Sequence, residues 1–471
     1  MDSVATAQRA LKEHFGFPDF RPSQRPVVES VMAGRHALAV LPTGAGKSVC
    51  FQVPAVALGG LTVVVSPLVS LMQDQVGAAR SRGIAAEHLS GELPKGRMDE
   101  VLRDARAGRL SLIYVSPERL PTLACRAFSA GVAARRLAVD EAHCISEWGH
   151  DFRPAFRNIG HAAELLGRPP IIALTGSATP TVRGDIMESL IPGEQRFDVH
   201  LASFDRTNLW FGACRIRREP DRMAVLRSLL RRDETAIVYA STRRATEKLA
   251  RALRYAGHVA EAYHAGLSRE RRDGCLDRFI KDEIRVVVAT SAFGMGIDKP
   301  GVRRVVHWTI PPTPESYYQE AGRAGRDGAP ARCFVLFSPG DAEIHERQLD
   351  VTFPPKKTLR ALWKGELAPE RVTAGVRASA DRLLKELGGS EHADGWHRIE
   401  RRRAAALARL KAITRYASGE QCRRRALVGY FGERLEECSG CDVCEGGAKS
   451  RFGSWVGRFV TLSPRQRAKG P

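Results

Sequence analysis

The sequence predicts an α/β protein with two parallel-sheet domains in tandem, followed by a small helical metal-binding module. The first observation is a series of short apolar runs that alternate with helical stretches. The second is that this series restarts after about residue 200. The third is a group of four cysteines near the C-terminal end. Such continuously apolar runs are typical of strands buried on both faces, in a parallel sheet covered by helices.

The two domains are defined by their predicted strands. We place the first domain at 1–202 and the second at 203–345, with the join near 203–220. The predicted strands of the first domain are HALAVLP (36–42), LTVVVSP (61–67), LSLIYVSP (110–117), RRLAVD (135–140) and PIIALTGSAT (170–179). Those of the second are TAIVYAST (235–242), VAEAYHAG (259–266), IRVVVATSA (284–292), VRRVVHWTI (302–310) and ARCFVLFSP (331–339). Strands separated by helices indicate two α/β domains in series.

The pattern changes after residue 345. We expect a variable helical insert at 346–397, a metal-binding module at 398–450 and a basic tail at 451–471. Within the insert, PPKKTLRALW, APERVTAGVRASADRLLKEL and GWHRIE fit three helices and a strand, and a small winged-helix unit is one interpretation. A helix rich in Arg and Ala is expected from residue 400 to about 416.

The chain is strongly basic, with a net charge of +20. Such an excess favours a polyanionic partner, either nucleic acid or an anionic membrane, although a generic solubilising charge is the alternative. No apolar run approaches the roughly 20 residues of a membrane span. The N-terminus lacks the apolar core of a signal peptide. We therefore expect a cytoplasmic protein with no membrane partner and no stabilising disulfides.

A glycine-rich segment, PTGAGKS (42–48), lies between the first predicted strand and the next helix. Backbone N–H groups in such a loop, with a helix N-terminus behind them, cradle phosphates. The glycines let the backbone approach, the lysine reaches the terminal phosphates, and the serine holds Mg²⁺. The general motif has a further glycine where this chain has Leu41. The predicted nucleotide-binding residues of the loop are Thr43, Gly44, Ala45, Gly46, Lys47 and Ser48.

A carboxylate pair, Asp140 and Glu141, follows another predicted strand of the same sheet. Ligands of α/β sheets bind at the carboxyl ends of the strands. Asp140 is therefore expected to hold Mg²⁺ together with Ser48, and Glu141 is expected to orient an attacking water. A solvated carboxylate pair at a strand end is less consistent with a phosphate loop in the same sheet.

The second domain contains two arginines in QEAGRAGRDG (319–328). Arg323 and Arg326 are three residues apart, which predicts that they share one helix face. They could stabilise charge on a γ-phosphate as arginine fingers do, and Gln319 is included in the same candidate catalytic group. The alternative is a basic surface patch, which leaves the glycines around them unexplained.

The four cysteines are spaced C-x15-C-x2-C-x2-C. This spacing favours tetrahedral Zn²⁺ in a structural site, with a Cys₄ iron–sulfur cluster as the alternative. The predicted ligands are Cys422, Cys438, Cys441 and Cys444. Arg423 to Arg425 follow the first ligand, and we expect them either to touch DNA or to form a solvated helix face.

Seven segments resemble the ordered motifs of superfamily-two helicases. They are PTGAGKS, VVVSPLVSLMQDQ (63–75), DEAH (140–143), LTGSATP (174–180), YHAGL (263–267), VVVATSAFGMGIDKP (286–300) and QEAGRAGRDG. FGFPDFRPSQ (15–24) and HCISEWGHDFRP (143–154) narrow the resemblance to the RecQ family of DNA helicases, and CRRRALVGYFGE with CSGCDVC resembles the RecQ zinc-binding module. The resemblance implies two RecA-like domains with ATP between them, and 3′-to-5′ translocation on single-stranded DNA.

The resemblance also assigns residues outside the phosphate loop. Gln24 would read the adenine edge, Arg21 would lie near it, and Phe17 would stack on it where many relatives have Tyr. In the loop after the acidic box, Trp148 and Phe152 suit stacking on DNA bases, and Arg153 suits contact with a phosphate or base. Packing of the two aromatics at the seam between the domains is the alternative. Gly176 and Ser177 depart from the usual threonine–alanine form of their motif.

From these features we expect an ATP-dependent 3′-to-5′ DNA helicase that acts in DNA repair or recombination. The expected cofactors are ATP, Mg²⁺ and Zn²⁺. The expected partners are single-stranded and tailed duplex DNA, and single-strand-binding or repair proteins. Only 27 residues follow Cys444, too few for the winged-helix and accessory helical domains of many relatives, so unwinding is expected to be limited to short duplexes. A DNA-binding or strand-annealing protein with an idle motor and an RNA helicase are the alternatives.

Overall fold

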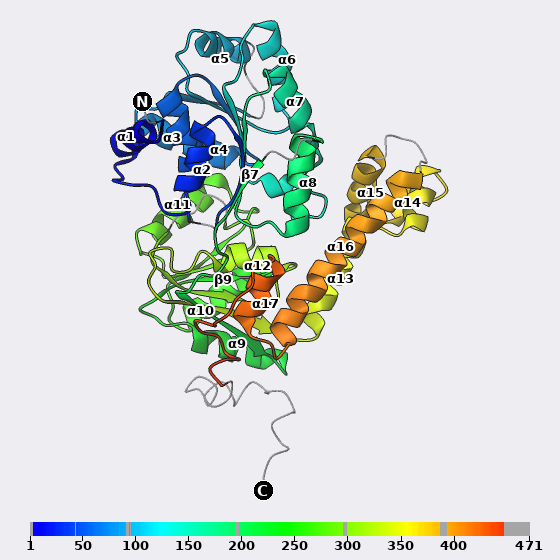
Figure 1. The fold of residues 1–471 in the computed structure, drawn as a ribbon. Helices are drawn as coiled ribbons and strands as arrows, with labels where there is room; N and C mark the ends of the chain where they lie inside the picture. Colours follow the sequence, from blue (N-terminus) through cyan, green and yellow to red (C-terminus); the bar gives the residue numbers. More distant parts are fainter. Residues whose placement is uncertain are drawn as a thin grey trace. The chain divides into compact units, whose positions relative to one another are not determined.

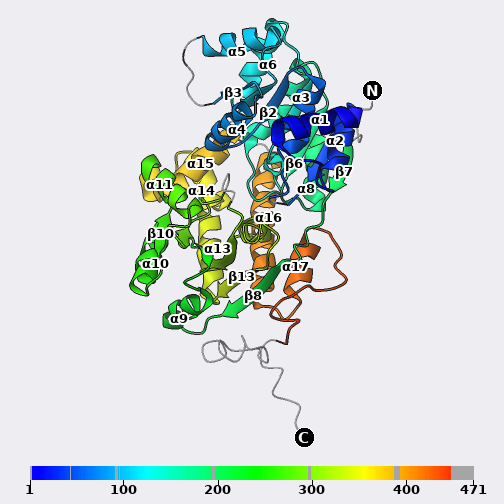
Figure 2. The same cartoon turned by 90° about the vertical axis from the view of Figure 1, so that its left-hand side faces the viewer.

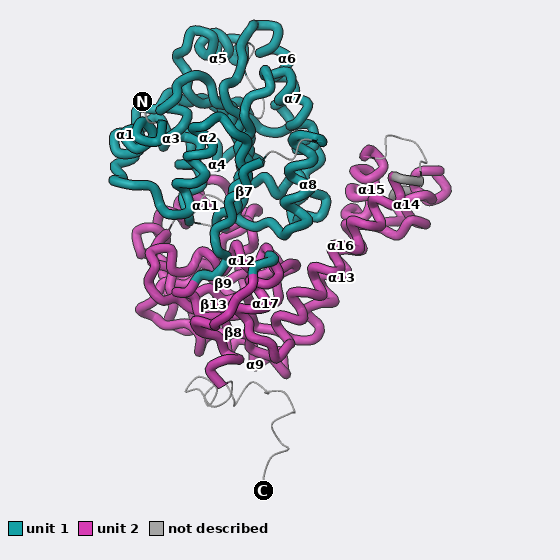
Figure 3. Tube along the Cα trace, viewed as in Figure 1, with its two compact units in different colours: residues 1–206, 294–298, 431–433 teal, residues 207–293, 299–430, 434–471 magenta. Residues whose placement is uncertain are grey.

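The computed structural model describes residues 3–42, 44–90, 94, 96–193, 197–294, 299–386 and 393–446. The chain divides into two units, coloured separately in Figure 3. Unit 1 comprises 1–206, 294–298 and 431–433, and unit 2 comprises 207–293, 299–430 and 434–471. No helix among the described residues is long and apolar enough to cross a membrane.

Unit 1 is built on a parallel sheet of seven strands, in the order β3-β4-β2-β5-β6-β1-β7. Its strands are β1 (His36–Val40), β2 (Thr62–Val65), β3 (Ala86–Leu89), β4 (Leu112–Val115), β5 (Arg136–Val139), β6 (Ile171–Thr175) and β7 (Phe197–Leu201). The five predicted strands are present. Because β5, β6 and β1 are neighbours, the loops after their carboxyl ends meet at one edge of the sheet.

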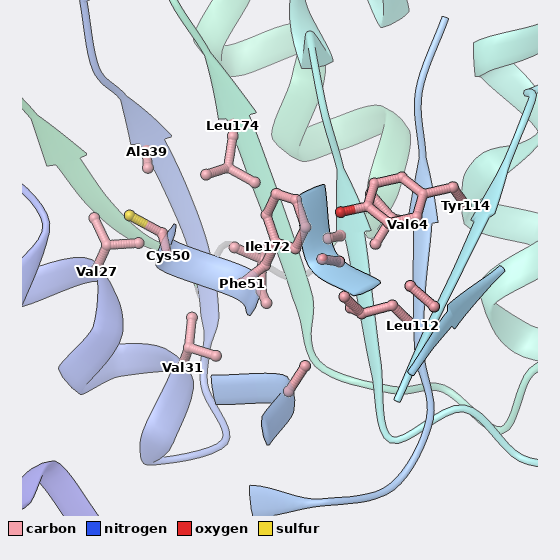
Figure 4. Packing of buried hydrophobic residues seen from close by; sticks show 14 of the residues in the cluster. Val27, Val31, Ala39, Cys50, Phe51, Val64, Leu112, Tyr114, Ile172 and Leu174 are labelled. Atoms are coloured by element: carbon pink, nitrogen blue, oxygen red, sulfur yellow. The ribbon is translucent and has the colours of Figure 1, made fainter. Parts of the chain in front are cut away.

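Helices alternate with the strands of unit 1 along the sequence (Figure 1). They are α1 (Ser3–Phe15), α2 (Arg25–Met32), α3 (Val49–Leu58), α4 (Val69–Ser81), α5 (Arg97–Arg106), α6 (Leu120–Ser129), α7 (Ile159–Leu165) and α8 (Pro180–Leu190), with the 3₁₀ turns η1 (Ala142–Ile145) and η2 (Pro154–Asn158). Figure 4 shows Phe51 beside Ile172 and Leu174, and Tyr114 beside Val64, in the core of unit 1. Continuous burial of the strands explains their apolar sequences.

Unit 2 contains a second parallel sheet, of six strands, in the order β10-β11-β9-β12-β13-β8. The strands are β8 (Leu209–Arg215), β9 (Thr235–Tyr239), β10 (Ala260–Tyr263), β11 (Val286–Ala289), β12 (Val302–His307) and β13 (Ala331–Phe337). The helices between them are α9 (Glu219–Leu229), α10 (Arg243–Tyr255), α11 (Arg269–Ile280) and α12 (Pro314–Ala321). The predicted α/β class with two parallel sheets is confirmed.

The region after β13 is helical in its described residues. It consists of α13 (Gly340–Thr352), α14 (Lys356–Trp363), the turn η3 (Pro369–Arg371), α15 (Ala374–Glu386), α16 (Ala393–Ser418) and α17 (Arg423–Tyr430). α14 and α15 gather at the N-terminal end of α16 (Figure 1), where Phe353, Leu359, Leu383 and Trp396 share a separate core. No strand lies among the described residues of 346–397, so the structure contradicts a winged-helix unit there. The segment GWHRIE, one of the three in which a strand was expected, lies inside α16, whose run of Ala, Leu and Arg favours helix.

Candidate functional site

The predicted phosphate loop connects β1 to α3 in unit 1. Gly44 and Gly46 have φ angles of +85° and +77°, which are left-handed conformations that favour glycine. Ser48 is the N-cap residue of α3, so the loop runs directly into a helix N-terminus. Thr43 lies outside the described residues. The loop therefore has the backbone form and the helix dipole that favour phosphate binding.

Gln24 holds the backbone of this loop through hydrogen bonds. Its side-chain Nε2 donates hydrogen bonds to the carbonyl oxygens of Ala45 at 2.8 Å and Gly46 at 3.1 Å, and its Oε1 accepts from the backbone N–H of Arg21. The Arg21 guanidinium also donates to the carbonyl of Gly44. A Cβ at Gly46 would lie 2.5 Å from Gln24 Nε2, so only glycine fits there without a shift.

These contacts use Arg21 and Gln24 as supports of the loop. Reading of the adenine edge by Gln24 remains a prediction. Phe17, the predicted stacking residue, exposes 52% of its surface and so presents an open aromatic face. An exposed ring close in sequence to residues that hold the phosphate loop is consistent with a base-stacking platform.

The carboxylate pair follows β5, at the same sheet edge as the phosphate loop. Asp140 is buried, and its Oδ1 accepts a hydrogen bond from the backbone N–H of Glu141 at 3.0 Å. Gln75 Nε2, from the predicted motif 63–75, lies 3.5 Å from Asp140 Oδ2. Glu141 has a left-handed backbone with φ of +48°, a conformation uncommon outside glycine and concentrated at functional sites.

The two carboxyl groups have pKa values displaced in opposite directions. Burial, and then the charge of Glu141, raise the pKa of Asp140. Burial also acts to raise the pKa of Glu141, but the charges of Lys47 and His143 outweigh it and lower that pKa. Lys47 thus acts electrostatically on both carboxyl groups, which places the loop lysine and the acidic pair in one site.

His143 connects the acidic pair to the motif at 174–180. Its Nδ1 lies 2.9 Å from Thr175 Oγ1 and 3.3 Å from Glu141 Oε2. Thr175 Oγ1 in turn accepts a hydrogen bond from the backbone N–H of Ser177 at 3.3 Å. Neither His143 nor Thr175 was among the predicted site residues. His143 could have been predicted from its place in the DEAH motif, and Thr175 from its position at the carboxyl end of β6.

The aromatic loop after the acidic box is compact and belongs wholly to unit 1. Trp148 exposes 38% of its surface, and Phe152 is half-buried with the Arg157 guanidinium 6.0 Å from its ring centre. The His150 ring stacks on His143 with 4.4 Å between centroids. His150, which we call the base of the aromatic loop, therefore contacts His143, the same histidine that contacts Glu141.

Arg153 has structural partners in the same loop. Its Nη1 donates to the carbonyl of Pro67 at 2.9 Å, and its Nη2 lies 3.2 Å from Asp151 Oδ2. These bonds fix the end of the loop against the segment that follows β2. The predicted contact of Arg153 with DNA remains a prediction.

The arginines of QEAGRAGRDG belong to unit 2. The prediction that Arg323 and Arg326 share a helix face is wrong, because α12 ends at Ala321 and residues 322–327 form turns. Gly325 has φ of +56°, and its carbonyl accepts a hydrogen bond from Asn208 Nδ2 at 2.8 Å. Gln319 lies in α12 itself. Arg323 is buried, and burial raises the pKa of the Tyr239 phenol while the charge of Arg323 acts to lower it.

The four predicted cysteine ligands come together in unit 2. Their sulfur atoms all lie within 4.8 Å of one another. Cys422 and Cys441 Sγ are 3.9 Å apart, close to the roughly 3.8 Å expected between thiolates bound tetrahedrally to Zn²⁺ at about 2.3 Å. The backbone N–H groups of Arg425 and Cys444 point to Cys422 Sγ and Cys441 Sγ at 3.5 and 3.4 Å. This donor set fits a closed structural zinc site.

Arg423 and Arg424 beside the first ligand are structural, so the expectation of a DNA contact or a solvated face is wrong for these two, whereas Arg425 is exposed. Arg423 is buried and pairs with Asp442 at 3.0 Å. Arg424 is fully buried, donates to the carbonyl of Leu209 in β8 and lies over the ring of Phe211. These contacts fasten α17 to β8, which Figure 2 shows beside each other.

Three family models match successive parts of the chain. Residues 21–185 match the DEAD/DEAH box helicase model, residues 221–328 match the helicase conserved C-terminal domain, and residues 382–445 match the RecQ zinc-binding model. The first match contains the phosphate loop and the acidic pair. The third contains all four cysteines.

Similar curated proteins include helicases of the RecQ type. ATP-dependent DNA helicase RecQ is 35% identical in Pasteurella multocida and 37% identical in Bacillus subtilis, each over 93% of this chain. The chain spans 62% and 66% of the length of those relatives. The probable ATP-dependent DNA helicase RecS of Bacillus subtilis is 34% identical over 93% of this chain, which covers 90% of that protein.

The solved structures that are similar share the fold. The Mycobacterium smegmatis helicase Lhr bound to single-stranded DNA and AMP-PNP gives a TM-score of 0.55 at 20% identity, over 89% of this chain and 58% of that one. The DUF1998 helicase MrfA bound to DNA gives a TM-score of 0.57 at 17% identity, over 74% of this chain and 53% of that one.

Proposed function

This chain belongs to the RecQ family of helicases, and on that premise we propose that it is an ATP-dependent DNA helicase that moves 3′-to-5′ on single-stranded DNA. Its proposed substrates are single strands and short duplexes with a 3′ tail, in DNA repair or recombination. The observation that carries the proposal is the shared position of the phosphate loop, Glu141 and the base of the aromatic loop in unit 1. A site that binds ATP is thereby connected by direct contacts to a loop suited to DNA bases.

The residues of unit 1 divide the chemistry between them. The loop N–H groups and Lys47 would bind the phosphates of ATP, and Ser48 and Asp140 would hold Mg²⁺. The bound Mg²⁺ would neutralise charge on the phosphate oxygens during transfer to water. Glu141, whose pKa is lowered, remains a carboxylate at neutral pH and would orient the attacking water.

The arginines of unit 2 complete the proposed catalytic group. In phosphoryl transfer, charge develops on the γ-phosphate oxygens, and a guanidinium that contacts them lowers the barrier. Arg323 and Arg326 follow α12, and the buried Nε of Arg323 has no hydrogen-bond acceptor among the described residues. We assign both arginines, with Gln319, to stabilisation of that charge.

Coupling to DNA is proposed to pass through His143. A base stacked on Trp148 would shift the loop that holds His150, and His150 stacks on His143 beside Glu141. Base stacking on an aromatic is worth about 1–3 kcal/mol and tolerates any sequence, as a translocating motor requires. DNA binding would therefore change the position of the group that orients water.

Unwinding of a short duplex with a 3′ tail, a 5′ tail or blunt ends tests the proposal. We expect strand separation of the 3′-tailed duplex only, and only with hydrolysable ATP and Mg²⁺. A protein that anneals complementary strands but does not separate them would establish the alternative, a DNA-binding protein with a weak motor. Preference for a 5′ tail would contradict the proposed polarity.

A further inference from the structure

A three-residue strip of the zinc-binding segment belongs to unit 1. The strip is Phe431, Gly432 and Glu433, between the end of α17 and Cys438. Residues on both sides of it, up to Tyr430 and from Arg434, belong to unit 2 (Figure 3). We call these three residues the anchor strip.

Glu433 holds the segment of unit 1 that comes just before the chain passes into unit 2 at Thr207. Its Oε1 accepts a hydrogen bond from Ser203 Oγ at 2.6 Å, and its Oε2 accepts from the backbone N–H of Phe204 at 2.7 Å. Both carboxylate oxygens are thus used on consecutive residues. Charge-assisted bonds to a hydroxyl and a backbone N–H are stronger than neutral ones. The two bonds therefore fix Ser203 and Phe204, which belong to the last residues of unit 1 before Thr207, residues 203–206, here called the linker.

The other two residues of the strip complete the contact. The Phe431 ring stacks on Phe204 with 4.3 Å between centroids and 4° between planes, and both rings are buried. The Phe431 carbonyl accepts a hydrogen bond from Arg183 at 3.4 Å. A Cβ at Gly432, which has φ of +84°, would lie 2.8 Å from Pro180 Cγ. The strip therefore fits against the first turn of α8 as well as against the linker.

The first turn of α8 continues from the motif that reaches the acidic pair. α8 begins at Pro180, directly after LTGSATP, and Thr179 caps it. In that motif Thr175 contacts His143, which lies beside Glu141. A short stretch of chain thus leads from the anchor strip to the group proposed to orient water.

The cysteine ligands enclose the strip in a closed loop. Cys422 precedes α17 and Cys438 follows the strip, with 15 residues between them. A metal bound by Cys422 and Cys438 joins the ends of that loop. Joining them lowers the entropy that the strip loses when it settles on unit 1.

We propose that Glu433 is a positioning residue of the motor, and that zinc bound at the four cysteines keeps the anchor strip on the linker and on α8. This inference rests on the proposed ATPase function. Removal of the Glu433 carboxylate would free Ser203 and Phe204, and through the strip weaken the contacts of Phe431 and Gly432 with the start of α8. The substitution would not touch ATP, DNA or the metal. Its effect would therefore appear in the DNA-stimulated rate and not in binding.

The test compares Glu433→Ala with Glu433→Gln and with Glu437→Ala, an exposed glutamate of the same segment that serves as the matched control. For Glu433→Ala we expect a loss of roughly 2- to 30-fold in DNA-stimulated kcat, the range found for residues that couple sites. The KM for ATP, the affinity for single-stranded DNA and the zinc content should not change. Glu433→Gln keeps one acceptor oxygen and should lose less activity, and Glu437→Ala should behave as wild type.

A second measurement detects the contact between Glu433 and Phe204 independently of enzymatic activity. The amide of Phe204 should be protected from hydrogen exchange in the wild type, and this protection should fall in Glu433→Ala and after zinc is removed by a chelator. Unchanged exchange at Phe204 in Glu433→Ala, or a Glu433→Ala enzyme with wild-type kcat, overturns the inference. A wild type that shows the protection but has no DNA-stimulated ATPase would instead refute the proposed function.

Discussion

His143 Nδ1 lies 2.9 Å from Thr175 Oγ1, so the acidic box after β5 and the motif after β6 are joined by direct contact. The same nitrogen lies 3.3 Å from Glu141 Oε2. Adjacent parallel strands place these two loops side by side. This relationship gives a physical route between the carboxylate proposed to orient water and the segment that leads to α8.

Thr175→Val tests that route. Valine keeps the shape of threonine but leaves His143 without the hydroxyl, so the histidine and Glu141 should lose their fixed positions. Loss of one hydrogen bond to a buried group costs about 1–3 kcal/mol. We expect a several-fold lower kcat for ATP with little change in KM. Thr175→Ser, which keeps the hydroxyl, should retain activity, and equal loss in both variants would speak for packing alone.

Trp148→Ala should uncouple DNA from hydrolysis. The half-exposed ring is the proposed stacking surface, and its loss removes about 1–3 kcal/mol of base stacking. Basal ATPase should persist while stimulation by single-stranded DNA falls sharply. Trp148→Phe keeps an aromatic face and is the control. Full stimulation of the alanine variant would show that the loop serves packing and does not sense DNA.

Gly46→Ala should damage the phosphate loop in two ways. The new Cβ would lie 2.5 Å from Gln24 Nε2, and the φ of +77° is strained for alanine. We expect at least a roughly tenfold weaker ATP affinity, measured by equilibrium binding, since strain of this kind costs about 1–3 kcal/mol. Gly77→Ala in α4, where the Cβ meets open space, is the matched control. Normal ATP affinity in Gly46→Ala would reject the role given to Gln24.

Cys441→Ser should abolish metal binding. Cys441 is buried, and the serine oxygen is a poor substitute for a thiolate. We expect one zinc per wild-type chain by elemental analysis, none in the variant, and aggregation because a metal-dependent module exposes its small core without the metal. Cys125→Ser, at an exposed cysteine outside the cluster, should keep its zinc. Iron in the wild type would favour the iron–sulfur alternative.

The sequence was sufficient for the features that depend on local pattern. The buried strands, the phosphate loop and the cysteine spacing each follow from neighbouring residues. β3 and β7 were not predicted because they are edge strands with half-exposed side chains, such as those of FDVHL, and lack a continuous apolar run. β8 lies inside the segment 203–220, which the sequence predicts only as the join between the domains.

Long-range pairing accounts for the remaining differences. From the sequence alone Arg424 resembles a solvated helix residue. In the structure it is buried against Leu209 and Phe211 of β8. α12 ends at Ala321 with Gly322 as its C-cap, so Arg323 lies in the following turn, where Asn208 donates a hydrogen bond to the carbonyl of Gly325. Glu433 meets its partners Ser203 and Phe204 more than 200 positions earlier in the chain, and no local spacing indicates that contact.

ATP hydrolysis by the purified chain, with and without single-stranded DNA, tests the central claim most directly when wild type is compared with Lys47→Ala. The charge of Lys47 acts to lower the pKa values of both Asp140 and Glu141, and its ammonium group would hold the terminal phosphates. We predict DNA-stimulated hydrolysis in the wild type and a loss of roughly 100-fold or more in the variant, with single-stranded DNA still bound. Lys12→Ala, at an exposed lysine of α1, is the control. Wild-type turnover by Lys47→Ala, or a wild type whose hydrolysis ignores DNA, would contradict the account.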